Sequence, residues 1–196
     1  MWQTLISGRN PKIINRGNNM FIQVIVLAII IGFIFKGNFK NLSSIKIEAL
    51  YLILASFLME AVVIMSIRKG FIHIGYVTYF IDAFMYALIF VFVYKNRKSP
   101  FILIMGFGFL LNAVAIFSNG GTMPVGVSAL HAAGINQSVG SQGLYVLIGN
   151  NTMFWFLGDI FPYTFLNKNI VSLGDLVAAL GMLLLIVKGM RQSEIR

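Results

Sequence analysis

The chain has 196 residues, of which 58% are hydrophobic and only 11% are charged. A soluble domain carries roughly 25% charged residues, so this composition excludes an ordinary soluble protein and indicates a protein embedded in a lipid bilayer. The formal net charge of +9 comes from basic residues in short clusters between apolar runs. This pattern is typical of membrane topology signals, and we expect no nucleic-acid partner. Cysteine is absent, which excludes a disulfide, a thiolate nucleophile and a cysteine-based metal site.

Five apolar runs divide the chain, and each is close to the ~20 residues that a helix needs to span a bilayer. They cover residues 20–35, 49–67, 75–94, 101–117 and 173–187. Because a helix satisfies its own backbone hydrogen bonds, the runs predict an all-α fold, a polytopic transmembrane helix bundle with about five spans. We divide the chain into a polar, basic N-terminal extension (1–19), a transmembrane domain (20–190) and a basic C-terminal tail (191–196).

Local signals support two of the helix starts. Ser99 and Pro100 supply an N-cap and a first-turn proline. Ser172-Leu-Gly-Asp175 resembles a capping box, with Asp where Glu or Gln is usual. Small residues on one face of the last helix predict close packing against a neighbouring helix. They are Gly174, Ala178 and Gly181. The connector 37–47 is expected either to lie on the membrane surface or to form a solvated loop.

The distribution of Lys and Arg sets the expected orientation, because cytoplasmic loops carry an excess of positive charge. With five spans, the connectors after the first and third helices share a side with the C-terminus. The basic residues of this side are Lys36, Lys40, Lys46, Lys95, Arg97, Lys98, Lys188, Arg191 and Arg196. We therefore expect the C-terminus in the cytoplasm, segment 118–172 outside a bacterial cell membrane, and the basic side against anionic lipid headgroups. The other side carries Arg68, Lys69 and Lys168 and, from the N-terminal extension, Arg9, Lys12 and Arg16. The extension opposes this orientation, and translation from Met20 would remove the conflict.

The segment 118–172 differs from the runs because it is long, nearly free of positive charge and mixed in polarity. Within it, residues 143–166 are apolar enough to touch lipid but are interrupted at 150–152, at Gly158-Asp159 and at Pro162. Irregular backbone at membrane depth must face protein or water, so we expect a broken, re-entrant or interfacial helical segment. A sixth full span is the alternative.

Four polar residues fall in the outer halves of their predicted helices: Glu60, Asp82, Asn112 and Asp175. A charged group inside a bilayer costs roughly 2.5–3.5 kcal/mol on insertion scales. Four polar groups at one level therefore predict a polar cavity open to the outside, in which Glu60 and Asp82 share one pocket. The structural alternatives are pairing across the bundle for the two acids, interhelical hydrogen bonding for Asn112 and helix capping for Asp175.

The outer segment adds further candidates. His131 and Asp159 are expected above the cavity, and a simply solvated position is the alternative for His131. Asn119-Gly120-Gly121 predicts a turn because glycine adopts positive φ, and its functional alternative is a backbone nest for an anion. No HExxH or comparable spacing is present, so we predict no metal site. Catalytic residues and cofactors are left unassigned.

Four elements of the chain resemble a bacterial family of small multi-pass integral membrane proteins of unknown function. They are the connector 37–46 (GNFKNLSSIK), N-G-G-x-M-P-V from Asn119 to Val125, Gly158-Asp159 with Pro162, and S-x-G-D from Ser172 to Asp175. The resemblance covers about residues 20–190. It implies the multi-pass architecture and marks the outer segment, and it implies no established activity.

Three function classes fit these features. We favour a membrane protein that binds or translocates a small solute or ion through its outward-facing acidic cavity. The second is a membrane enzyme acting on a lipid headgroup at the outer surface, with His131 and either Asp159 or Asp175 as general base and electrostatic partner. The third is a non-catalytic scaffold for another membrane protein. A homo- or hetero-oligomer is compatible with all three, and whether the protein is an enzyme stays open.

Overall fold

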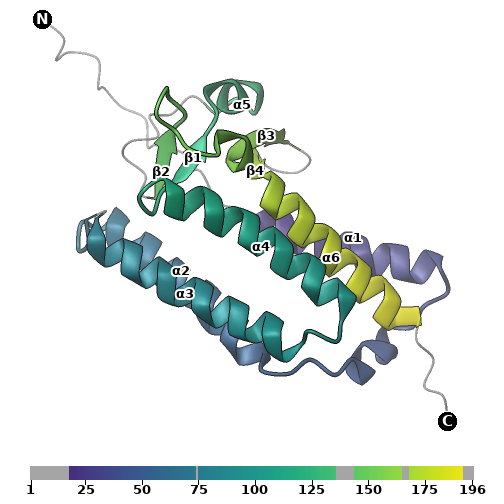
Figure 1. The fold of residues 1–196 in the computed structure, drawn as a ribbon. Coiled ribbons are helices and arrows are strands. Elements are labelled where there is room, and N and C mark those ends of the chain that lie inside the picture. Colours follow the sequence, from purple (N-terminus) through teal and green to yellow (C-terminus); the bar gives the residue numbers. More distant parts are fainter. Residues whose placement is uncertain (1–17, 74, 136–143, 165–167, 192–196) are drawn as a thin grey trace, which may run out of the picture.

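A computed structural model describes residues 18–73, 75–135, 144–164 and 168–191. Five long helices lie side by side, and a small sheet covers one end of them (Figure 1). The helices are α1 (Asn18–Ile34), α2 (Leu50–Arg68), α3 (Tyr76–Lys95), α4 (Pro100–Ser118) and α6 (Leu173–Arg191). All five predicted apolar runs are therefore helical. Most of the N-terminal extension, with Arg9, Lys12 and Arg16, and the tail after Arg191, with Arg196, lie outside the described residues.

The length and composition of the helices suit a membrane location. Four of them, α2, α3, α4 and α6, are long and apolar enough to cross a bilayer, whereas the apolar part of α1 is shorter, Met20–Ile34. Large apolar side chains are exposed along their outer faces, among them Leu58 at 67% and Phe80 at 70%. Such wide apolar surfaces are typical of helices that face lipid rather than water.

The helix pairs with the most extensive packing are α4 with α6, α1 with α6 and α2 with α3. The contact between α4 and α6 is unusually close. A Cβ atom on Gly108 would lie 2.4 Å from the carbonyl oxygen of Gly174 and 2.5 Å from the backbone nitrogen of Ala178. A Cβ on Gly181 would lie 2.7 Å from the carbonyl oxygen of Phe101. The predicted close-packing face of small residues is confirmed, and its partner is α4.

The end of the bundle opposite the sheet is held together by backbone and amide contacts. The connector after α1 forms a short 3₁₀ helix, η1 (Phe39–Ser44), and the Asn41 side chain donates to the carbonyl oxygen of Met190 at 2.8 Å. The Asn96 amide donates to the carbonyl oxygen of Glu48 and accepts from its backbone nitrogen, both at 2.8 Å. The connector is therefore packed against the end of α6, and Lys40 and Lys46 are exposed on it.

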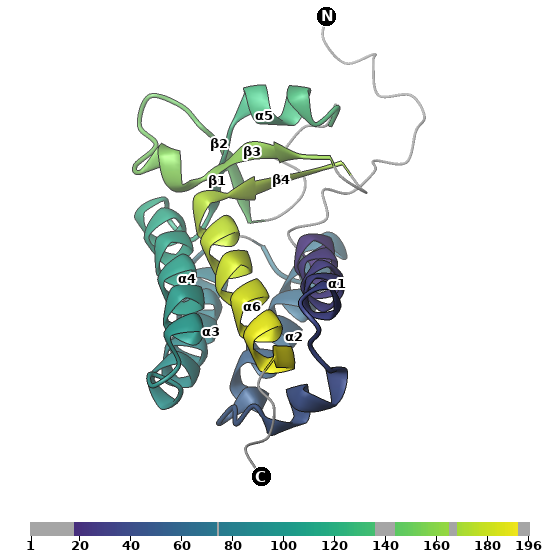
Figure 2. The same ribbon diagram turned by 90° about the vertical axis from the view of Figure 1, so that its right-hand side faces the viewer.

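The segment between α4 and α6 is not the broken or re-entrant helix that we expected, and the fold is not all-α. It forms a four-stranded sheet in the order β2-β1-β3-β4, with β1 parallel to β2 and β3 and with β3 antiparallel to β4. The strands are β1 (Met123–Val125), β2 (Tyr145–Leu147), β3 (Asp159–Tyr163) and β4 (Asn169–Ser172). A short helix, α5 (Val127–Ala132), lies on the side of the sheet away from the bundle (Figure 2).

The expected interruptions at 150–152 and at Gly158 are real, but strands and a 3₁₀ turn flank them. A turn occupies residues 150–151, and η3 (Trp155–Leu157) ends at Gly158. Among the described residues 144–164 there is no long helix, so the alternative of a sixth span is also wrong. The misassignment has a physical cause: short apolar runs fit a strand and a buried helix equally well. An open sheet exposes unpaired backbone groups at its edges, so this layer belongs outside the hydrocarbon core of a bilayer.

Candidate functional site

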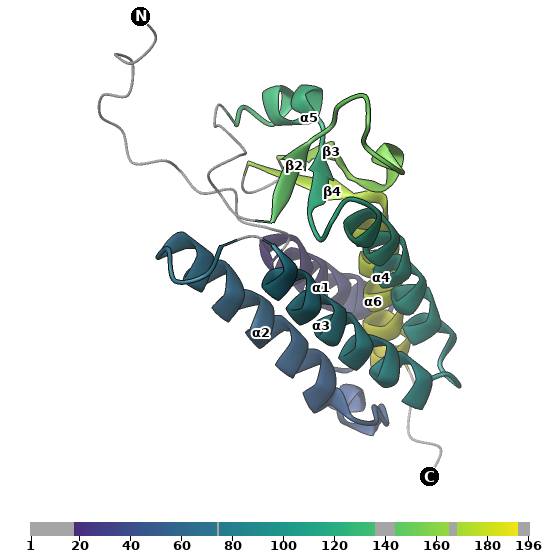
Figure 3. The ribbon, with the colours of Figure 1, turned by 60° about the vertical axis from the view of Figure 1, so that its left-hand side comes forward.

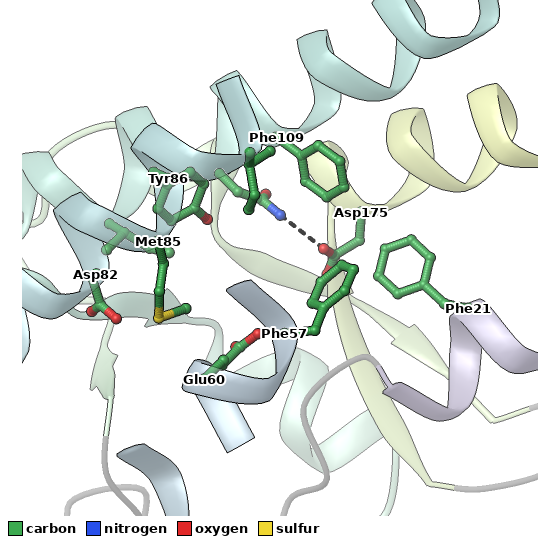
Figure 4. A pocket seen from close by; sticks show the side chains of 11 residues that line it. Phe21, Phe57, Glu60, Asp82, Met85, Tyr86, Phe109 and Asp175 are labelled. Carbon is green, nitrogen blue, oxygen red and sulfur yellow. Dashed lines mark hydrogen bonds between the residues drawn. The ribbon is translucent and has the colours of Figure 1, made fainter. Parts of the chain in front are cut away.

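A small cavity of about 60 Å³ lies inside the bundle, near the ends of the helices that carry the sheet (Figure 4). Its lining includes the four polar residues that we predicted at one level. They are Glu60 of α2, Asp82 of α3, Asn112 of α4 and Asp175 of α6. The cavity has room for a few water molecules or a small ionic group. The described residues that line it include no Lys and no Arg.

Asp175 and Asn112 form the best-defined corner of the cavity. The Asn112 side chain donates to Asp175 Oδ1 at 2.8 Å and accepts from the Ser172 hydroxyl at 2.7 Å. Asp175 Oδ2 accepts from the Ser172 backbone nitrogen at 3.2 Å, and the Ser172 hydroxyl accepts from the Asp175 backbone nitrogen at 2.9 Å. The predicted capping box is therefore confirmed. The same bonds support both structural alternatives, the cap for Asp175 and interhelical hydrogen bonding for Asn112.

Glu60 and Asp82 line the cavity from neighbouring helices, so the expectation that they share one pocket is met. Asp82 is 4% exposed, whereas Glu60 is half-buried. In Figure 4 the Glu60 carboxyl group points in among the lining side chains, whereas Asp82 lies at their edge, with Met85 between the two acids. Tyr86, one turn after Asp82, also lines the cavity, and its ring packs edge-on against Phe117 with 5.5 Å between the centroids. The acids are thus set among apolar and aromatic side chains.

Sequence reasoning missed the aromatic part of this site. Phe21 of α1, Phe57 of α2 and Phe109 of α4 also line the cavity. The Phe57 ring lies between the other two. Its centroid is 6.4 Å from that of Phe21 and 6.4 Å from that of Phe109. A signal was available for two of them. Phe57 and Phe109 each stand three residues before a polar lining residue, a spacing that places both side chains on one helix face.

The Asn119-Gly120-Gly121 element is a structural turn. Gly120 and Gly121 have φ values of 69° and 83°, as expected for glycine after a helix. The Asn119 side chain donates to the carbonyl oxygen of Met153 at 2.8 Å and accepts from its backbone nitrogen at 3.0 Å. The backbone nitrogens of Asn119 and Gly121 both donate to Ile116. These bonds support the turn and not the anion nest.

The remaining two candidates lie in the outer layer. His131 is exposed on α5, and Asp159 is buried at the start of β3, at 3% exposure. Neither is among the described residues that line the cavity, whereas Asp175 is. The three residues of the enzyme hypothesis therefore have three different surroundings. Within the described ranges, no group of three or more Asp, Glu or His side chains is placed to hold a metal ion.

A family model described as "Family of unknown function (DUF5317)" matches residues 44–187. The chain belongs to this family. The match runs from the end of η1 into α6, so it contains the whole sheet and all four polar residues of the cavity, while Phe21 lies outside it. It begins later than the resemblance that we expected from about residue 20, and most of the connector 37–46 is not covered. Comparisons with curated proteins and with solved structures give no match.

Proposed function

We propose that this member of the DUF5317 family is an integral membrane protein that binds a small cation of the ammonium class in the acidic cavity. The observation that carries the proposal is the lining: three carboxyl side chains and an amide, with no Lys or Arg among the described lining residues. Carboxyl groups inside a bilayer-spanning bundle are costly, and a bound cation lowers this cost by direct attraction. The cavity therefore favours positive charge.

The arrangement gives each polar group a role. Asn112 and the Ser172 backbone nitrogen hold the Asp175 carboxyl in place, so it can accept from a ligand without rearranging. Glu60 and Asp82 supply further acceptors from α2 and α3. The faces of aromatic rings attract ammonium groups, and Phe21, Phe57 and Phe109 lie at the same cavity. A compact ammonium group suits both the charge and the size of this site.

Methylammonium binding tests the proposal. With purified protein in phosphatidylcholine nanodiscs, we expect methylammonium to raise the melting temperature and sodium at equal ionic strength to raise it less, because ligand binding stabilises the folded state. The double variant Glu60→Gln/Asp82→Asn should weaken methylammonium binding by about tenfold or more, since it removes two charges. Glu48→Gln, an exposed acid at the other end of the bundle, is the matched control. An equal response of the double variant and the wild type would refute the proposal.

We also propose an orientation, with the sheet outside a bacterial cell membrane and the C-terminus in the cytoplasm. It is supported by basic residues in the connectors and helix ends that lie opposite the sheet; Figures 1 and 2 show that these connectors and helix ends share one end of the bundle. The described members of this basic end are Lys36, Lys40, Lys46, Lys95, Arg97, Lys98, Lys188 and Arg191. Positive residues of this kind stay in the cytoplasm and contact anionic lipid headgroups.

Single-cysteine variants test the orientation. The chain contains no cysteine, so no native cysteine has to be replaced first. We expect an impermeant maleimide to label Asn150→Cys in intact cells, because residue 150 is in an exposed turn beside the sheet. Lys98→Cys, exposed between α3 and α4, should be labelled only after lysis. The reverse pattern would show that the sheet faces the cytoplasm.

A further inference from the structure

A second and larger hollow adjoins the acidic cavity. It has a volume of about 590 Å³, within the range of roughly 300–1,000 Å³ that is usual for ligand sites. All of its described lining residues are apolar, and they come mainly from α1, α2, α4 and α6. Residues of α1 and α2 both line the groove, and Figure 3 shows how these two helices lie in the bundle.

The groove and the cavity are continuous through one aromatic layer. Phe21, Phe57 and Phe109 line both spaces. On α2 the groove follows Leu50, Leu54 and Phe57, and the cavity begins with Phe57 and Glu60, one helical turn further on. The acidic end therefore stands at the half of the bundle near the sheet, and the apolar groove runs from it toward the basic end.

The groove is also open to the lipid. Ile22 of α1 and Leu54 of α2 both line it, and they are 60% and 59% exposed. These side chains lie within the apolar parts of their helices, Met20–Ile34 and Leu50–Ile67, and such exposed apolar surface suits contact with lipid. An alkyl chain can therefore enter the groove sideways from the bilayer without crossing water.

We infer that the ligand is an amphiphile, with an amine head group in the acidic cavity and an alkyl chain in the groove between α1 and α2. This inference rests on the proposed function, because it takes the ammonium site as given and adds a binding site for an alkyl chain attached to the amine. Charge complementarity selects the head group, since the cavity offers carboxyl groups and aromatic rings. The alkyl chain of the ligand is inferred from the apolar lining of the groove, which shares three phenylalanines with the head-group site.

Photocrosslinking tests the inference with dodecylamine that carries a diazirine at the end of its chain. With the full chain in phosphatidylcholine nanodiscs, we expect crosslinks on α1 and α2 residues of the groove, competed by dodecylamine and not by dodecanoate. Leu54→Trp fills the groove and should reduce crosslinking by about tenfold. Leu58→Trp is the matched control, because Leu58 is 67% exposed on the same helix and lines neither space.

Methylammonium has no alkyl chain long enough for the groove, so its binding tests the ammonium site separately from the alkyl-chain site. Leu54→Trp should keep the wild-type response to methylammonium, which also shows that the variant is folded. If methylammonium binds but Leu54→Trp and Leu58→Trp crosslink alike, or if crosslinks fall outside the groove, the chain site is wrong and the ammonium site stands. If methylammonium gives no response and Glu60→Gln/Asp82→Asn leaves crosslinking unchanged, the proposed function and the inference both fail.

Discussion

Replacing Gly108 with valine is expected to separate α4 from α6 and to lower the free energy of unfolding by about 3 kcal/mol or more. A Cβ at this position would lie 2.4 Å from the carbonyl oxygen of Gly174 and 2.5 Å from the nitrogen of Ala178. Both are backbone atoms of α6, so no side-chain rotation can relieve the overlap. Since α6 also carries Asp175, the cavity should open along with the helix pair.

Thermal unfolding and size-exclusion profiles in detergent measure this effect. Gly108→Ala should show a smaller loss than valine, because it adds only the first carbon atom. Gly149→Ala is the control, since a Cβ at Gly149 would have no atom within 4 Å. A melting temperature for Gly108→Val equal to that of Gly149→Ala would mean that α4 and α6 do not approach as closely as described.

Asn112→Leu is expected to have the second largest effect, a loss of about 2–4 kcal/mol. The substitution removes the amide that donates to Asp175 Oδ1 and the oxygen that accepts from the Ser172 hydroxyl. It leaves one oxygen of a carboxyl group and a buried hydroxyl without these partners, next to an apolar side chain. Unsatisfied polar groups are most costly where water cannot replace the lost bond.

The hydrogen bonds that join Asn112, Ser172 and Asp175 allow a further test. Substitutions of residues that share partners do not have additive effects on the free energy of unfolding. Asn112→Leu combined with Ser172→Ala should cost less than the sum of the two single losses. Leu110→Ala, which is exposed on the same helix, is the control and should change stability by about 0.5 kcal/mol. Full additivity of the Asn112 and Ser172 losses would show that the two side chains act separately. Methylammonium binding should fall in Asn112→Leu as well, because Asp175 loses the group that positions it.

The helices and the level of the cavity were predictable from sequence because both depend on local properties. An apolar run of helical length identifies a span wherever its neighbours lie, and the Ser172–Asp175 capping box forms within one turn. Glu60, Asp82, Asn112 and Asp175 could be placed at one level because helix rise converts sequence position into depth. The family match over residues 44–187 agrees with a single unit that contains these residues.

The sheet could not be predicted, because its strands are short and their partners are distant in sequence. Met123 pairs with Tyr145, and Val125 pairs with both Leu147 and Asp159. Strands of three to five residues carry little periodicity, so nothing local distinguishes them from a broken helix. His131 and Asp159 were accordingly expected near the cavity, and the sheet and α5 hold them in the outer layer.

The apolar groove and its link to the acidic cavity are likewise properties of the tertiary structure alone. Phe21 is separated from Phe57 by a connector and from Phe109 by two further helices, and the packing of the whole bundle brings the three rings to one place. By itself the sequence determined which segments form long apolar helices and at what level along them the polar residues lie, because apolar length and helix rise are local properties. Which helix faces meet, and what space they leave between them, was decided by side-chain packing between distant segments.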